Sequence, residues 1–269
     1  FIFFVFGIKM AKNFASNPTN ITNYYTTNNN TLPMTVDDIY SNNQLCNIKN
    51  RNPFIRKVYT NLSIMWFFIS AICYGFIYNE KMNMFANSTE ASRLMIFAYI
   101  ALFLSVLLPI CFESLVKTSP SDYFILFIYT ATEAYILGIV CARNNTQAVF
   151  LAAGTTLVIT LAMTLFACQT KYDCTGSGGF LLTALSGIIA INIINIFVGS
   201  STVNLWAACA SVVLFSAYIV YDTQLIVGGS HKKYQFSTDD HVLATISIHL
   251  DMVNLFLNIL QILTSSNSD

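Results

Sequence analysis

Long apolar segments alternate with short polar connections through most of the chain after residue 60. A helix that crosses a bilayer needs about 20 mainly apolar residues, and each segment is close to that length. The pattern therefore predicts seven membrane-spanning helices: Leu62 to Tyr78, Leu94 to Phe112, Tyr123 to Ala142, Ala148 to Ala167, Gly179 to Val198, Leu205 to Val227, and His241 to Leu263.

The polar segments that flank these helices predict the rest of the organisation. Residues 1–52 include a stretch rich in Asn, Thr and Ser, which is typical of a disordered tail because it has little apolar surface to bury. Residues 53–264 are expected to form one helical bundle, and residues 265–269 a short C-terminal tail. The first nine residues are assigned no role.

Composition agrees with an all-α membrane protein. Of the 269 residues, 55% are hydrophobic and only 10% are charged, whereas about a quarter are charged in soluble proteins. The 13 basic and 13 acidic residues balance, so the chain lacks the basic surface that a nucleic-acid partner requires. No pair among the seven cysteines has metal-site spacing, and no resident cofactor is expected.

Basic residues in the connections predict the orientation of the bundle. With seven helices, ten of the 13 Lys and Arg residues lie on the same side as the amino terminus. Because short cytoplasmic connections carry an excess of Lys and Arg, we expect the amino terminus to be cytosolic.

A carboxylate, Asp251, lies near the middle of the last apolar segment. A charged side chain at the centre of a spanning helix costs about 2.5 to 3.5 kcal/mol on insertion scales, so it usually faces a bundle interior. At 100° per residue, Asp251 belongs to a polar face, which comprises Ser247, Asp251, Asn254, Asn258 and Gln261. This face predicts an interior helix; it lines either an ion path or, for the Ser and Asn residues, contacts that hydrogen-bond helices together.

Asp222, near the end of the preceding segment, is the candidate partner of Asp251. Two aspartates at close quarters in a dry site share a proton and respond to pH. Their oxygens could also hold Ca²⁺ transiently. The nominal depths of the two residues differ by roughly 10 Å at 1.5 Å per residue, so tilt or register must close that gap.

Two further ionisable residues lie inside apolar segments. Glu133 is in the middle of the third segment and is expected to face the same interior, either as part of an ion path or as a protonated structural group. His249 lies about 200° around the helix from Asp251, which predicts that it packs away from the carboxylate.

Four blocks of residues, in order and on matching segments, resemble the transmembrane BAX-inhibitor-motif family and its lifeguard branch. They are Phe54-Ile55-Arg56-Lys57-Val58-Tyr59; Phe166-Ala167-Cys168-Gln169-Thr170-Lys171-Tyr172-Asp173 with Gly178-Gly179; Tyr221-Asp222-Thr223-Gln224; and Leu250-Asp251 with Asn254-Leu255-Phe256. The resemblance covers the chain from about Phe54 to Leu263.

The resemblance implies a bundle whose C-terminal helix is central and wrapped by the other six. It also implies a pH-sensitive Ca²⁺ leak in an internal-store membrane of the endoplasmic reticulum or Golgi, with the plasma membrane as a further candidate. The gate would be a di-aspartyl pair, Asp222 and Asp251, supported by Glu133, Tyr221, Ser247, Asn254 and Asn258. The implied partners are Ca²⁺, protons, the lipid bilayer and cell-death regulatory proteins, and the implied role in cells promotes survival.

Some family members have an arginine at the cytosolic end of the second helix that locks the closed pair. Here that segment has no arginine, and Lys117 is the candidate gate lock. A lysine would act only as a point charge, because it lacks the planar fork of a guanidinium.

Three functions other than the leak are compatible with parts of this pattern. An intramembrane aspartyl protease also has a Tyr-Asp pair such as Tyr221-Asp222, but its second aspartate follows Gly-x-Gly, whereas Asp251 follows Ile248-His249-Leu250. We therefore expect no enzymatic activity. A membrane scaffold that regulates cell-death or receptor proteins remains open, and short connections disfavour a ligand receptor.

Overall fold

The computed structural model describes residues 36–111, 121–229 and 232–266. Its helices are α2 (Val36–Tyr78), α3 (Glu80–Ala86), α4 (Thr89–Cys111), α6 (Ser121–Arg143), α7 (Thr146–Gln169), the 3₁₀ turn η2 (Thr175–Ser177), α8 (Gly178–Val198), α9 (Ser201–Val227) and α10 (His241–Ser266). Residues 1–35, the candidate gate lock Lys117, and residues 267–269 lie outside the described residues.

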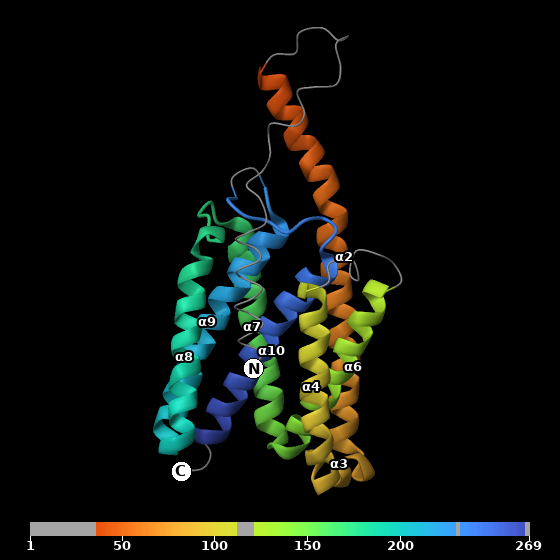
Figure 1. Cartoon of the computed structure of the whole chain (residues 1–269), viewed down its shortest axis with the longest axis vertical. Helices are drawn as coiled ribbons and strands as arrows, with labels where there is room; N and C mark the ends of the chain where they lie inside the picture. The colour runs from red at the N-terminus through yellow and green to blue at the C-terminus, as the bar shows by residue number, and fades with distance from the viewer. Residues whose placement is uncertain (1–35, 112–120, 230–231, 267–269) are drawn as a thin grey trace.

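The predicted all-α membrane fold is confirmed. Seven helices of the described residues are long and apolar enough to cross a membrane, and each predicted segment overlaps one of them. Helix α2 begins at Val36, inside the segment for which a disordered tail was expected, and its first turns project beyond the bundle (Figure 1). The short helix α3 lies in the connection between α2 and α4.

Local sequence explains where several helices begin and end. Asn79 and Asn145 accept backbone hydrogen bonds at the first turns of α3 and α7, and Ser200 does so for α9. Such side chains satisfy amide groups that have no partner within the helix. Helix α9 ends at Val227 and is followed by Gly228, whose φ of 62° suits glycine.

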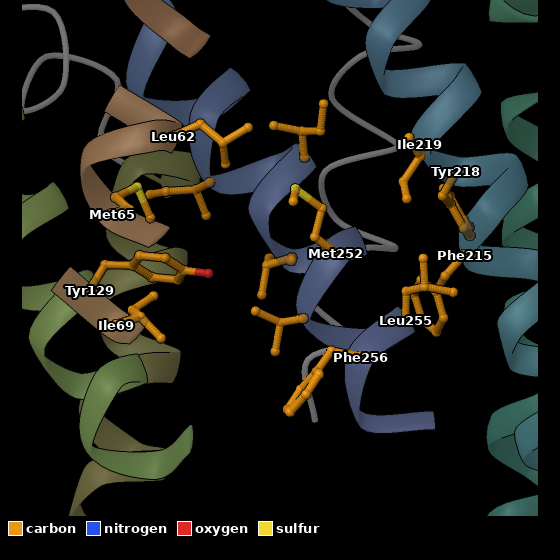
Figure 2. Close-up of a cluster of buried hydrophobic side chains, with 14 of the residues drawn as sticks. Leu62, Met65, Ile69, Tyr129, Phe215, Tyr218, Ile219, Met252, Leu255 and Phe256 are labelled. Carbon is orange, nitrogen blue, oxygen red and sulfur yellow. The ribbon is translucent and has the colours of Figure 1, made fainter. Parts of the chain in front are cut away.

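Helix α10 is the centre of the bundle. Its spanning window is 83% buried, whereas the other six windows are between 22% and 50% buried. It packs most extensively against α9 and also contacts α2, α4, α6 and α7, while α8 packs on α9 (Figure 1). Figure 2 shows Leu255 on the α9 side of α10 and Phe256 on the other side. Along the polar face of α10, Ser247, Asp251 and Asn254 are buried and Asn258 is partly buried, whereas Gln261 is exposed. The face is therefore enclosed by protein around Asp251, as its sequence predicted, but not at Gln261.

One glycine sets the spacing between α2 and α6. A Cβ atom at Gly138 would lie 2.5 Å from Cδ2 of Phe76, a distance too short for two carbon atoms. Gly187, on α8, has open space where its Cβ would stand.

We expect Gly138→Ala to destabilise the protein by about 1 to 3 kcal/mol, because the added methyl group forces Phe76 out of its position. Thermal unfolding in detergent checks this, with Gly187→Ala as the matched control. The control should melt at the wild-type temperature or above it, since alanine favours helix. Equal melting of both variants would contradict the close packing.

Candidate functional site

The two aspartates lie in the interior on adjacent helices. Asp222 is five residues before the end of α9 at Val227, and Asp251 is near the middle of α10. Both side chains are fully buried, with 0% of their surface exposed. The structure thus gives Asp251 the interior position that its cost in a bilayer demands.

Tyr218 lies close to both carboxyl groups. It lies one turn before Asp222 on α9, at about the depth of Asp251, and its side chain interacts electrostatically with both aspartates. Figure 2 shows it beside Ile219 on the α10-facing part of α9. Tyr221, predicted as a supporting residue, is buried and interacts with Asp222. The sequence offered one signal for Tyr218, its spacing of four residues from Asp222, which places both on one face of α9.

A second tyrosine extends this polar line to Glu133. Tyr129, on α6, interacts electrostatically with both Asp251 and Glu133. Glu133 is 1% exposed and also interacts with Tyr99 of α4 and Cys73 of α2. The three carboxyl groups, on α9, α10 and α6, thus form an ionisable line in which Tyr218 is close to the first two and Tyr129 to the last two.

The line descends through the bundle. At 1.5 Å per residue, Asp222 lies about 8 Å below its end of α9, and Asp251 about 15 Å below the start of α10. Glu133 lies about 18 Å below the start of α6 on the same count. The three helix ends used here belong to the same side of the bundle (Figure 1). The line thus runs from near one membrane face to beyond the middle of the bundle.

The polar face of α10 divides into two parts. Ser247 is buried one turn above Asp251, and its hydroxyl has no hydrogen-bond partner among the described residues. Asn254 and Asn258 donate to carbonyl oxygens of their own helix, at 2.7 Å from Leu250 O and Asn254 O. Each amide nitrogen thus donates within α10, and the expected bonds of these two residues to other helices are absent among the described contacts.

His249 faces away from Asp251, as its position on the helix predicted. Its Nδ1 lies 2.8 Å from the hydroxyl of Tyr129, and its ring centroid lies 5.1 Å from that of Trp66 on α2. Since Tyr129 also interacts with Asp251, His249 is linked to the carboxyl line through that tyrosine.

Loop contacts close the bundle above Asp222. The side chain of Gln224 accepts a hydrogen bond from the Cys174 amide at 2.7 Å and donates one to Tyr172 O at 3.0 Å. The carboxylate of Asp173 accepts hydrogen bonds from the hydroxyl of Thr175 at 2.7 Å and from the amide of Lys233 at 2.9 Å. These bonds join the α7–α8 connection to α9 and to the α9–α10 connection. We call the two joined connections the loop layer.

Arg51 fastens α2 to the same layer. Its guanidinium donates to the carbonyl oxygens of Leu225 at 2.6 Å and Ile226 at 3.1 Å, at the end of α9, and to that of Phe236. The sequence marked Arg51 only as one of the basic residues. Its partners lie more than 170 positions away, so no local pattern could have identified the clamp.

Hard cations such as Ca²⁺ prefer oxygen ligands, and the sequence predicts that role for Asp222 and Asp251. Within the described ranges, no group of three or more His, Cys, Asp or Glu side chains has the arrangement of a metal site.

Comparison with known proteins identifies the family. Residues 51–268 match the Bax1-I family, which is described as inhibitor of apoptosis-promoting Bax1. The chain belongs to this family. The match begins at Arg51, the residue that clamps the end of α9. The predicted BAX-inhibitor resemblance is confirmed, and the protein is a multi-pass member of a family of anti-apoptotic membrane proteins.

Several proteins with similar sequences align with more than half of this chain. Protein LIFEGUARD 4 of Arabidopsis thaliana is 29% identical over 78% of this chain and 83% of its own length. The Golgi anti-apoptotic protein of Vaccinia virus (strain Lister) is 30% identical over 81% of this chain and 87% of its own. A Helicobacter pylori (strain J99) protein is 37% identical over 55% of this chain, and the matched part spans 63% of that relative's length.

Asp173 provides a pH-dependent test of the loop layer. Partial burial raises the pKa of Asp173, but the hydrogen bonds from Thr175 and Lys233 outweigh it and bring the pKa below its ordinary value of 3.8. Because the pKa is lowered in the folded protein, the carboxylate stabilises the fold at any pH above its ordinary pKa. This stabilisation is lost as the pH falls through the lowered, folded-state pKa.

We expect Asp173→Asn to lower the melting temperature by about 2 °C near neutral pH, a small effect because the site is partly solvated. The difference from wild type should shrink as the pH falls below 3.8. Differential scanning fluorimetry across pH checks this, with the exposed Asp239→Asn as control. A difference that grows on acidification would contradict the assignment.

Proposed function

We propose that this protein is a pH-sensitive Ca²⁺ leak of an intracellular membrane, gated by Asp222 and Asp251, and that its role in cells is anti-apoptotic. The observation that carries the proposal is the pair of fully buried carboxyl groups on adjacent helices with Tyr218 interacting with both. A structural role alone would not require two carboxyl groups in the interior, where each costs free energy to ionise.

Protonation is the switch in this mechanism. Two carboxylates that interact titrate as a pair, and the charge of the pair changes with pH. With the proton lost, the pair attracts a divalent cation and its two members repel each other across the α9–α10 contact. With the proton shared, both effects weaken, so helix packing and cation binding respond to pH together.

The carboxyl line gives the path a direction. From Asp222, beneath the loop layer, the line continues to Asp251 and then, through Tyr129, to Glu133. A cation that passes from one carboxyl group to the next is never far from a compensating charge inside the bilayer. We assign Glu133 to the lower part of the path, and Ser247, one turn above Asp251, to its lining.

Relatives support the cellular part of the proposal. A Vaccinia virus relative is named a Golgi anti-apoptotic protein, and the family description refers to inhibition of Bax1. We therefore assign this protein to the Golgi or endoplasmic reticulum, with cell-death regulatory proteins as partners. The excess of basic residues on one side supports a cytosolic amino terminus.

A flux measurement tests the leak. We expect purified protein in liposomes loaded with a Ca²⁺-sensitive dye to give a flux that changes between about pH 6 and about pH 8, the range in which a coupled pair can titrate. Asp251→Asn and Asp222→Asn should each remove most of this pH dependence, because the remaining carboxyl group has no partner with which to share a proton.

Asp239→Asn, which removes an exposed carboxylate from the α9–α10 connection, is the matched control and should leave the flux and its pH profile unchanged. A flux that is independent of pH and insensitive to Asp251→Asn would rule out the gate. Absence of flux in folded protein, with binding to cell-death proteins retained after Asp251→Asn, would favour the scaffold.

A further inference from the structure

A groove lies between α2 and α7 on the outside of the bundle. It has a volume of about 820 Å³, within the range of small-molecule sites, and its floor is formed by Ile248, Met252 and Phe256 of α10. Both walls are membrane-spanning helices. Several wall residues are exposed, among them Tyr74 on α2 and Leu157 and Leu161 on α7. The groove thus opens at the depth of the lipid chains.

The groove follows one face of α2 along most of the membrane thickness. Its α2 wall runs from Tyr59 through Trp66 to Ile77, a length of about 27 Å at 1.5 Å per residue. The hydrocarbon core of a bilayer is about 30 Å thick. The lining is mainly apolar, with small residues such as Gly154 on the α7 wall. A long apolar chain that lies parallel to the helices fits this shape.

A positive charge stands at the end of the groove where α2 enters the membrane. Arg56 is one turn before Tyr59 and lies within about 60° of the line through Tyr59 and Ile77 on α2, so it continues the same face. Its side chain is exposed, and no ion pair joins it to an acidic residue in the described part of the chain. An arginine in this position is suited to a phosphate, whose oxygens match the guanidinium.

We propose that this groove binds an anionic phospholipid of the surrounding bilayer, with one acyl chain against α10 and the phosphate at Arg56. The apolar walls favour the acyl chain, and the positive charge of Arg56 at the end of the groove attracts the anionic headgroup. The lipid would touch Ile248 and Met252, which precede and follow Asp251 on α10. It would also shield α10 from the rest of the bilayer in the gap between α2 and α7. This proposal does not depend on Ca²⁺ flux.

The two tryptophans of the chain make the groove directly measurable. Trp66 lines the groove, whereas Trp206, on α9, is 71% exposed and lies away from it. Bromine atoms on an acyl chain quench tryptophan fluorescence on contact. In a Trp206→Phe protein, quenching by brominated lipid therefore reports the occupant of the groove through Trp66.

The protein is reconstituted in phosphatidylcholine vesicles that contain equal fractions of brominated phosphatidylglycerol or brominated phosphatidylcholine. We expect Trp66 to show about a fivefold preference for the anionic lipid, the contribution of one basic residue near a membrane surface. Arg56→Gln should abolish that preference. A Trp66→Phe protein, which reports through Trp206, should show no preference for either headgroup.

Substitutions at two glycines distinguish lipid bound in the groove from lipid on the general surface of the protein. A Cβ atom added at Gly154, in the α7 wall, or at Gly187, on α8, meets no protein atom within 4 Å. Gly154→Leu should fill the groove and reduce the quenching of Trp66, whereas Gly187→Leu should leave it unchanged. Equal quenching by both lipids in the Trp206→Phe protein would overturn the proposed headgroup site. Quenching that Gly154→Leu does not reduce would overturn binding in the groove.

Discussion

The cost of placing a carboxyl group near the centre of a bilayer governs how this bundle is arranged. Asp251 lies in the middle of α10, and a charge there is tolerated only if protein or water surrounds it. Helix α10 is accordingly enclosed by α2, α4, α6, α7 and α9, and Asp251 has no exposed surface. The same constraint accounts for the position of Asp222 on α9, the helix that packs most extensively against α10.

Two tyrosines relate the three interior carboxyl groups to one another. Tyr218 interacts with Asp222 and Asp251, and Tyr129 with Asp251 and Glu133, so three carboxyl groups on three helices belong to one electrostatic system. A tyrosine hydroxyl can donate or accept a hydrogen bond, which suits carboxyl groups whose protonation changes. The loop layer held by Arg51, Gln224 and Asp173 closes the bundle on the side of Asp222.

The sequence predicted those features that depend on local pattern. Apolar length identified the seven spanning helices, and the polar face around Asp251 identified α10 as interior, because both signals repeat within one segment. Tyr218 and Tyr129 were missed because a tyrosine in an apolar helix also fits ordinary packing. The Arg51 clamp joins residues far apart in the chain, and the bonds of Asn254 within its own helix depend on a rotamer that spacing does not determine.

The central claim is that Asp222 and Asp251 titrate as a coupled pair, and infrared spectroscopy tests it most directly. The carbonyl stretch of a protonated aspartate is distinct from that of its carboxylate, so each group can be followed across pH in wild type, Asp222→Asn and Asp251→Asn. We expect removal of either carboxyl group to shift the titration midpoint of the other, since coupling is reciprocal. Midpoints that do not change when the partner is removed would contradict it.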